Sequence, residues 1–265
     1  MIHSTAIVEA GAELGEVEVG AYAVIGRGVR LHDGVRVGPH AVIEGDTEIG
    51  PRTVIHAHAV LGGPPQDKKH DPEVKTTLRI GADNVFREFS TAHRGTAGGR
   101  GETVIGDRNY FMASSHVAHD CIVGNDTMFA NSAAIAGHVD VADGAVLGGL
   151  CAVHQHARIG RLAMIGGGAM CAQDVPPFTL AQGDRARLHG VNIIGLRRAG
   201  LDDATFSALK DAWRTLFVSD LPRKTAIGRV EETWGQVAEV RELIAFLRST
   251  TRGVCRSGVA SADAS

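Results

Sequence analysis

The chain has 265 residues, of which 44% are hydrophobic, only 5% are aromatic and 34 are glycine. Its formal net charge of −3 gives no reason to expect a nucleic acid or a membrane surface as a partner. The sequence has no apolar run of about 18 residues and no signal-peptide pattern, so we expect a cytoplasmic protein that does not insert into a membrane.

Large apolar residues recur at every sixth position along most of the chain. The first series is Ile2, Val8, Leu14 and, after one dropped residue, Val19, Ile25, Leu31, Val37, Ile43, Ile49, Ile55 and Leu61. The second series is Ile105, Phe111, Val117, Val123, Phe129, Ile135, Val141, Leu147, Val153, Ile159, Ile165 and Cys171. This period fits neither a helix nor a single alternating strand. It is typical of hexapeptide repeats, in which three short strands make a triangular coil and the coils stack into a parallel β-helix.

Two segments interrupt the repeat. The first, 63–77, holds Pro64 and Pro65 and the charge run Asp67-Lys68-Lys69, which would by default be a solvated surface. The second, 94–102, is rich in glycine. We therefore predict a parallel β-helix over residues 1–190 with loop excursions near 63–77 and 94–102. About eight to ten coils, stacked at ~4.8 Å, would make a prism roughly 40–50 Å long.

Helical periodicity replaces the repeat near Leu201. Asp202 is a plausible N-cap for a helix over 203–217, and further helices are predicted over 223–234 and 237–249. We therefore predict a C-terminal helical domain over residues 191–252. The remaining residues, 253–265, are small and polar, and we expect a disordered tail.

The four cysteines do not suggest a disulfide framework. Cys121, Cys151 and Cys171 fall on interior positions of the repeat, where a free cysteine behaves as a small hydrophobe. We expect these three thiols to be buried and structural, and Cys255 to lie in the tail.

The repeat also predicts which distant residues become neighbours. If one coil takes about 18 residues, position i lies under position i+18 at ~4.8 Å. Two columns then form along one edge of the prism: His119–Gly137–Gln155, and Asp120–His138–His156–Asp174. Six of the 13 histidines lie between His93 and His156, so histidine side chains are concentrated in this part of the prism.

A convex prism has no pocket of its own. A cleft forms where the edges of neighbouring subunits face each other, and triangular rods pack naturally around a threefold axis. We therefore predict a homotrimer with sites between subunits, in which the 63–77 loop reaches the histidine edge of its neighbour.

His119 followed by Asp120 is the best candidate for a general base, because a neutral imidazole can accept a proton near pH ~7 and a carboxylate can orient it. Gly137, one coil away, could offer its backbone N–H to a developing oxyanion. Together they suit acyl transfer by direct attack of a hydroxyl group on a thioester. The sequence contains no Gly-x-Ser-x-Gly motif, and this chemistry needs no Ser or Cys nucleophile.

Other interpretations remain open at this point. Hexapeptide proteins of the γ-class carbonic anhydrase type hold zinc with histidines from two subunits, and the spacing of His116 and His119 does not exclude a metal. A non-catalytic scaffold is a third possibility, although it would have no need of a base and an oxyanion donor in register. His56, His58, His93 and His189 are interpreted as ordinary surface or packing residues.

Several motifs resemble, in the same order, those of the UDP-N-acetylglucosamine 3-O-acyltransferases that begin lipid A biosynthesis in Gram-negative bacteria. They are His116-Val117-Ala118-His119-Asp120-Cys121, Ala136-Gly137-His138, Ala152-Val153-His154-Gln155, Ala172-Gln173-Asp174-Val175-Pro176-Pro177 and Gly190-Val191-Asn192. The resemblance covers nearly the whole chain, to Ser249-Thr250-Thr251-Arg252-Gly253. Hexads alone are shared by many acyltransferases, but these motifs are specific.

The resemblance implies a left-handed β-helix trimer, with transfer of a 3-hydroxyacyl chain from acyl carrier protein to the 3-hydroxyl of UDP-N-acetylglucosamine. It implies no cofactor beyond the phosphopantetheine of the donor, and no metal. His119 would be the base, Asp120 its partner and Gly137 the oxyanion donor, and Gly167 would cap the acyl-chain pocket. The positions implied to contact substrate are Asp67, Lys69, His116, His138, His154, Gln155, Asn192 and Arg198.

The sequence departs from the family pattern at three positions. Ile194 stands where a Glu is usual, Ala199 where a second Arg is usual, and Arg185 where a His is frequent. These changes affect the expected contacts with the nucleotide and the far end of the acyl pocket, but not the expected acyl-transfer reaction. Some members transfer to a 3-amino analogue of the sugar, and the sequence does not separate the two acceptors.

Basic residues outnumber acidic ones between Arg158 and Lys224. They include Arg161, Arg185, Arg187, Arg197, Arg198 and Arg214. An acidic acyl carrier protein would be steered to such a surface, whereas the alternative is a solvated helix face.

Overall fold

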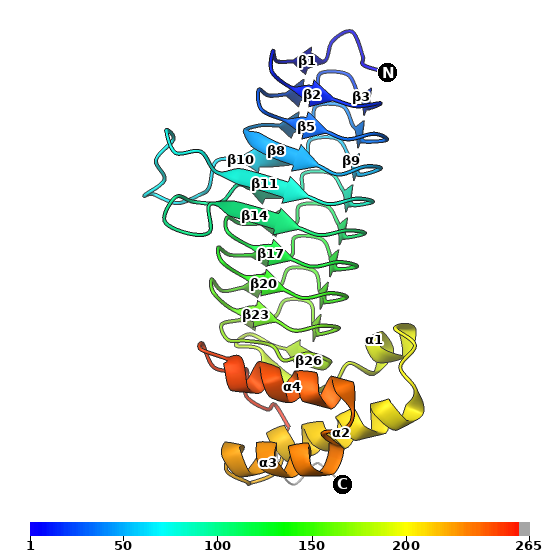
Figure 1. Cartoon of the computed structure of the whole chain (residues 1–265), viewed down its shortest axis with the longest axis vertical. Helices are drawn as coiled ribbons and strands as arrows, with labels where there is room; N and C mark the ends of the chain where they lie inside the picture. Colours follow the sequence, from blue (N-terminus) through cyan, green and yellow to red (C-terminus); the bar gives the residue numbers. More distant parts are fainter. Residues whose placement is uncertain (260–265) are drawn as a thin grey trace.

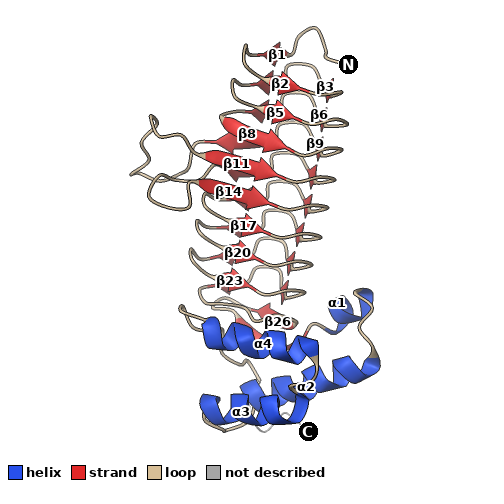
Figure 2. Ribbon diagram, in the orientation of Figure 1, coloured by secondary structure: helices blue, strands red, loops and turns tan. Residues whose placement is uncertain are grey.

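The computed structural model describes residues 1–259 as a prism of stacked coils with a group of helices at one end (Figure 1). Three sheets of short strands form the faces of the prism, and Figure 2 shows successive coils adding one strand to each of them. The parallel β-helix followed by a helical region is therefore confirmed. No helix among residues 1–259 has the length and apolarity needed to cross a membrane.

The strands are named by sheet. Sheet 1 contains β1 (Ile7–Val8), β4 (Val24–Ile25), β7 (Val42–Ile43), β10 (Val60–Gly63), β13 (Thr91–His93), β16 (His116–Val117), β19 (Ala134–Ile135), β22 (Ala152–Val153) and β25 (Met170–Cys171). Sheet 2 contains β2 (Glu13–Leu14), β5 (Arg30–Leu31), β8 (Asp46–Ile49), β11 (Thr77–Ile80), β14 (Glu102–Ile105), β17 (Ile122–Val123), β20 (Asp140–Val141) and β23 (Arg158–Ile159). Sheet 3 contains β3 (Glu18–Val19), β6 (Arg36–Val37), β9 (Val54–Ile55), β12 (Val85–Phe86), β15 (Tyr110–Phe111), β18 (Met128–Phe129), β21 (Val146–Leu147), β24 (Met164–Ile165), β26 (Thr179–Gln182) and β27 (Arg187–Val191).

The strand register follows the sequence period. His116 pairs with Ala134, eighteen positions on, whereas near the N-terminus Ile7 pairs with Val24, seventeen positions on, where one residue is dropped. The second residue of most two-residue strands points inward and is buried, and the interior rings of Phe86, Phe111 and Phe129 stack at centroid distances of 4.5 and 4.9 Å. From Val19 onward the apolar position of each hexad thus forms one continuous core, whereas Ile2 and Val8 in the first coil are exposed.

Both predicted loops leave the prism at one corner. The first joins β10 to β11 and the second joins β13 to β14, so each connects sheet 1 to sheet 2 (Figure 1). The short connection between β16 and β17, which contains His119 and Asp120, turns the same corner one coil after the second loop. The loops therefore emerge along the edge that carries the histidines.

The predicted stacking of Asp174 on His156 is wrong. Ile159 pairs with Val175, only sixteen positions on, because the last coil is shorter than the others. The Asp174 carboxylate instead accepts hydrogen bonds from the Arg158 backbone N–H at 2.9 Å and from the Thr250 hydroxyl at 2.6 Å. Asp174 therefore joins the coil to the C-terminal segment and lies outside the histidine column.

The helices agree with the sequence prediction except for a short one that it missed. They are α1 (Ile193–Arg198), α2 (Asp203–Phe217), α3 (Arg223–Trp234) and α4 (Ala238–Ser249). The Asp202 side chain caps α2 by accepting from the Thr205 N–H at 2.7 Å. The missed helix, α1, is only six residues long and has a single buried residue, so the sequence shows little periodicity there.

Two of the predicted basic residues are used inside the chain. Arg158 lies over the Phe246 ring at 4.4 Å and donates to the Phe246 carbonyl, and Arg161 pairs with Glu242 at 2.9 Å. Both contacts fasten α4 to the last coils, so these two arginines are not free for a partner.

The expectation of a disordered tail from Gly253 is wrong for residues 253–259. Val254 pairs with Asp174 and Ser257 with Leu188, and Val254 and Cys255 are buried. Residues 260–265 lie outside the described part of the chain. All four cysteines are free and buried, which confirms the prediction for Cys121, Cys151 and Cys171.

Candidate active site

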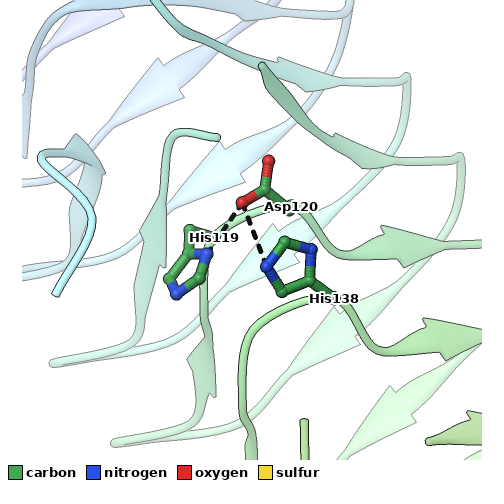
Figure 3. A group of neighbouring side chains, drawn as sticks. All are labelled: His119, Asp120 and His138. Atoms are coloured by element: carbon green, nitrogen blue, oxygen red, sulfur yellow. Dashed lines mark hydrogen bonds and ion pairs between the residues drawn. The ribbon is translucent and has the colours of Figure 1, made fainter. Parts of the chain in front are cut away.

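His119 and Asp120 form a hydrogen-bonded pair at the corner between β16 and β17 (Figure 3). The His119 Nδ1 atom lies 2.8 Å from Asp120 Oδ2, and the His119 side chain is 15% exposed while that of Asp120 is fully buried. An ionised carboxylate can only accept, so Nδ1 must carry the proton and donate it. The Nε2 atom of neutral His119 then keeps a free lone pair, as a general base requires.

Asp120 is held ionised despite its burial. Burial raises the pKa of its carboxyl group, but hydrogen bonds from the Thr96 hydroxyl, His119, and the backbone N–H groups of Thr96 and Arg100 outweigh it and hold the pKa below its usual value. Thr96 and Arg100 come from the loop between β13 and β14, and no sequence motif indicated a role for them at this site. The only signal was the interruption of the repeat just before the His119 coil.

Gly137 lies against the His119 ring, as the column of i and i+18 predicted. A Cβ at this position would lie 2.4 Å from Cε1 and 2.7 Å from Nε2 of His119, so only glycine leaves room for the ring. In the described part of the chain the Gly137 N–H donates to no acceptor, because Gly137 stands at a corner between strands. A free N–H beside the base matches the requirement for an oxyanion donor.

His138 and His156 continue the edge. The His138 Nε2 atom lies 3.7 Å from Asp120 Oδ2, and the His138 ring stacks on His156 with centroids 4.5 Å apart. Burial is the main reason that the pKa of His138 is lowered, although Asp120 acts in the opposite direction. His138 and His156 both adopt φ of 63°, the left-handed corner conformation, as Asp120 does at 59°. The three residues therefore occupy equivalent positions in successive coils.

His116 and His93 form a second pair on sheet 1. His116 Nδ1 lies 2.7 Å from the Thr91 hydroxyl, and its ring packs edge-on against His93 at 4.8 Å. Burial, with the nearby His116 and His119, lowers the pKa of His93 to about 4, and burial lowers that of His116 as well. Both imidazoles are therefore neutral near pH ~7.

His154 and Gln155 are exposed one coil beyond Gly137. The Arg252 Nη2 atom lies 2.8 Å from His154 Nδ1, and the Gln155 carbonyl oxygen lies 3.2 Å from the same nitrogen. A guanidinium can only donate, so the shorter contact makes Nδ1 an acceptor and leaves the proton on Nε2. Arg252 therefore favours the Nε2-protonated form of the exposed His154 ring.

Other predicted residues lie elsewhere in the single chain. Asp67 and Lys69 lie in the loop between β10 and β11, where the Asp67 carboxylate accepts from the Lys69 N–H at 2.9 Å. Gly167 is exposed at the corner between sheets 3 and 1. Asn192 caps α1 and donates to the Leu162 carbonyl at 2.9 Å, and Arg198 is exposed at the end of that helix. Among residues 1–259 no hydrogen bond or ion pair joins these five residues to His119.

His119, Asp120 and His138 could also be considered as metal ligands, because one ligand atom of each lies within 4.8 Å of the others. The donor set does not favour this. The Asp120 oxygens already accept from Thr96 Oγ1 at 2.6 Å, from Thr96 N at 3.0 Å and from Arg100 N at 2.7 Å, besides His119. A carboxylate with about four acceptor positions has none left for a cation. The cluster fits a base with its orienting acid.

Comparison with known proteins finds relatives over nearly the whole chain. Residues 174–255 match the family model described as UDP-N-acetylglucosamine O-acyltransferase, domain 2, and residues 28–63 match the bacterial transferase hexapeptide model. An acyl-(acyl-carrier-protein)–UDP-N-acetylglucosamine O-acyltransferase from Thermodesulfovibrio yellowstonii is 47% identical over 96% of this chain and 99% of its own. The corresponding protein of Xanthomonas campestris is 45% identical over 97% of this chain and 98% of its own.

Solved structures agree with the sequence relatives. LpxA from Acinetobacter baumannii superimposes with a TM-score of 0.93 at 38% identity, covering 96% of this chain and 99% of its own. The UDP-N-acetylglucosamine acyltransferase from Campylobacter jejuni gives 0.90 at 35% identity, covering 97% and 99%. The similarity therefore extends over the coil and the helices together.

Proposed function

The chain belongs to the family of acyl carrier protein-dependent UDP-N-acetylglucosamine O-acyltransferases, and we propose that it performs the acyl transfer of the first step of lipid A biosynthesis. The observation that supports this most directly is the His119–Asp120 pair beside the free N–H of Gly137. Base and oxyanion donor lie one coil apart on one edge, where a hydroxyl and a thioester could meet.

The proposed reaction needs only these groups. His119 Nε2 takes the proton of the sugar 3-hydroxyl while the hydroxyl oxygen attacks the thioester carbonyl of the 3-hydroxyacyl donor. The Gly137 N–H stabilises the tetrahedral oxyanion. When the C–S bond breaks, the pantetheine thiolate leaves and takes the proton from His119. Asp120 stays ionised throughout and stabilises the imidazolium between the two proton transfers.

We propose that the chain works as a homotrimer. The outward residues of sheets 1 and 3 are mostly apolar, for example Val42 and Val60 on one and Val54 and Val85 on the other, whereas sheet 2 presents residues such as Arg79 and Asp140. The corner shared by sheets 3 and 1 exposes Tyr22, Phe89 and Leu150 by 58, 58 and 69%. Two apolar faces meeting at an apolar edge favour packing of three copies around that edge.

A trimer would also bring the scattered substrate residues together. In this proposal the neighbour's Asn192 and Arg198 face the edge with His116, His138, His154 and Gln155, and Gly167 borders the acyl chain. Asp67 and Lys69 reach the sugar from the loop between β10 and β11 of a neighbouring copy. The acidic carrier protein is proposed to dock on exposed basic residues of the helical region, Arg214 among them. The cytoplasmic location expected from the sequence stays a prediction.

The test is mass spectrometry of the nucleotide sugar after incubation with a mixture of 3-hydroxyacyl carrier proteins. Wild type should add one acyl chain whose mass gives its length, and His119→Ala should add none at the same enzyme concentration. His32→Ala, which removes an exposed histidine directly after β5 and near Glu48, should behave as wild type. Cleavage of the adduct by mild base indicates an ester, and resistance indicates the amide made on a 3-amino acceptor.

Two results would contradict the proposal. If a preparation that light scattering shows to be trimeric made no product with either acceptor sugar, the proposed transferase activity would be refuted. If the protein were monomeric and fully active, the proposed trimer and the proposed site between subunits would be refuted.

A further inference from the structure

The loop between β13 and β14 does more than interrupt the repeat: it covers Asp120. Residues 94–101 leave the corner between sheets 1 and 2 one coil before His119 and fold over the next turn of the same corner. Thr96 and Asp120 are both buried, with exposures of 5% and 0%, where they meet. The carboxylate of the dyad thus lies between its own coil and this loop.

The loop fills the acceptor positions of the Asp120 carboxylate. Oδ1 accepts from the backbone N–H groups of Thr96 at 3.0 Å and Arg100 at 2.7 Å. Oδ2 accepts from the Thr96 hydroxyl at 2.6 Å and from His119 Nδ1 at 2.8 Å. An ionised carboxylate has about four acceptor positions, so the group cannot rotate without breaking several charge-assisted bonds at once.

The shape of the loop suits this contact. A Cβ on Gly99 would lie 2.5 Å from the Asp120 carboxylate carbon, and the N–H groups of Gly99 and Gly101 both donate to the Thr96 carbonyl, at 3.2 and 3.1 Å. The Arg100 guanidinium spans two coils, donating to the Asp120 carbonyl at 2.8 Å and to the Asp140 carboxylate at 2.6 Å. The loop is therefore closed on itself and fastened on both sides of Asp120.

We propose that Thr96 and Arg100 are positioning residues that fix the Asp120 carboxylate so that His119 carries its proton on Nδ1 and presents Nε2 to the acceptor hydroxyl. The inference rests on the proposed acyl transfer and extends the site to the loop that holds Asp120. A neutral imidazole can hold its proton on either nitrogen, and only the Nδ1-protonated form can act as the base here. The loop therefore selects the reactive form of His119.

The experiment compares Thr96→Val, which keeps the shape and loses the hydroxyl, with Thr96→Ser, which keeps the hydroxyl. Each full-length protein is assayed for kcat and for KM toward the nucleotide sugar, and the tautomer of His119 is measured by NMR of isotope-labelled histidine. Thr127→Val is the matched control, because Thr127 is also buried and its hydroxyl donates to Asn109 at 2.7 Å. Melting curves and light scattering show that each variant is folded and assembled.

We expect Thr96→Val to lower kcat by roughly 10- to 100-fold with KM within about twofold, and to shift His119 toward the Nε2-protonated form. Thr96→Ser should restore most of the rate and the tautomer, and Thr127→Val should change neither. A folded Thr96→Val protein with unchanged kcat and tautomer would overturn the inference, as would equal losses for the Val and Ser variants. If wild type proved inactive as a transferase, the tautomer comparison would still decide the role of Thr96.

Discussion

Gly137→Ala tests the proposed arrangement of His119 as base and Gly137 as oxyanion donor most directly. The new Cβ would lie 2.4 Å from Cε1 and 2.7 Å from Nε2 of His119, whereas an ordinary contact between such atoms is about 3.5–4.0 Å. The ring must therefore move by about 1 Å or more. Because the 2.8 Å bond to Asp120 holds the ring in place, that movement breaks a hydrogen bond to a buried carboxylate.

Two magnitudes follow from the displacement. Loss of a hydrogen bond to a charged group should lower the free energy of unfolding by about 1.5–3 kcal/mol. Misplacing the base by about 1 Å should lower kcat by about 100-fold. The backbone N–H of residue 137 is retained in the variant, so the loss of rate would report the position of His119 and not the loss of the oxyanion donor.

The assay is a double-mutant cycle that compares the effect of Gly137→Ala in wild type with its effect in His119→Ala. Urea denaturation at one protein concentration and kcat are measured for wild type, Gly137→Ala, His119→Ala and the double variant. In the His119→Ala background the methyl group meets no ring, so its effect on stability should fall below about 0.5 kcal/mol. Gly228→Ala, in which the added Cβ on α3 would meet no neighbouring side chain, is the control and should keep wild-type kcat. Equal destabilisation in both backgrounds, or wild-type kcat in Gly137→Ala, would refute the reasoning.

Four further outcomes are expected. Burial and the neighbouring histidines lower the pKa of His93 to about 4, whereas a histidine in the unfolded chain titrates near ~6.5, so the unfolded chain binds this proton first as the pH falls. Wild type should therefore lose about 3 kcal/mol of stability as the pH falls between those two values, and His93→Gln should not show this loss. Urea denaturation measures the stability of both proteins against pH, and an equal pH dependence would contradict the prediction. Arg214→Glu should raise KM for the carrier-bound donor several-fold, whereas Arg27→Glu at the other end of the prism should not. If Arg214→Glu had the same KM as wild type, Arg214 would not be part of the docking surface. Arg252→Met should reduce the Nε2-protonated fraction of His154 in NMR spectra and raise KM for the nucleotide sugar, and an unchanged tautomer would show that Arg252 does not orient this ring. Dialysis against a chelator should leave kcat unchanged, because the acceptor positions of the Asp120 carboxylate are filled by hydrogen bonds. Loss of activity on dialysis that added zinc restores would instead support a metal site at His119, Asp120 and His138.

The hexapeptide period was enough to predict the register of the histidine edge. One strand per hexad and three hexads per coil place His119 beside Gly137, and Asp120 beside His138, and the structure confirms both neighbours. The prediction succeeded because parallel strands in a regular coil repeat the same offset, so a local period determines contacts between distant residues. Where the offset changes, the prediction failed: the shortened last coil moves Asp174 from His156 to Arg158.

The helices were predicted from local signals as well. Apolar spacing and the Asp202 cap identified α2, because both features act within a few residues of each other. The segment 253–259 offers no such signal, being small and polar, yet Val254 is buried because it pairs with the exposed backbone of the last coil. The basic residues Arg158 and Arg161 were expected at a surface for the same reason, since nothing near them in sequence reveals the aromatic and acidic partners on α4 and elsewhere.

By itself, the sequence determined the coil, its period and the residues of one edge, because a repeated pattern converts local spacing into long-range register. Only the tertiary structure showed what lies over that edge. The path of an irregular loop depends on contacts that it makes after the coil has formed, so the donors from Thr96 and Arg100 to the Asp120 carboxylate have no periodic signature. The Nδ1 proton of His119 depends on those contacts, and the chemistry of the site is therefore decided by the loop as much as by the repeat.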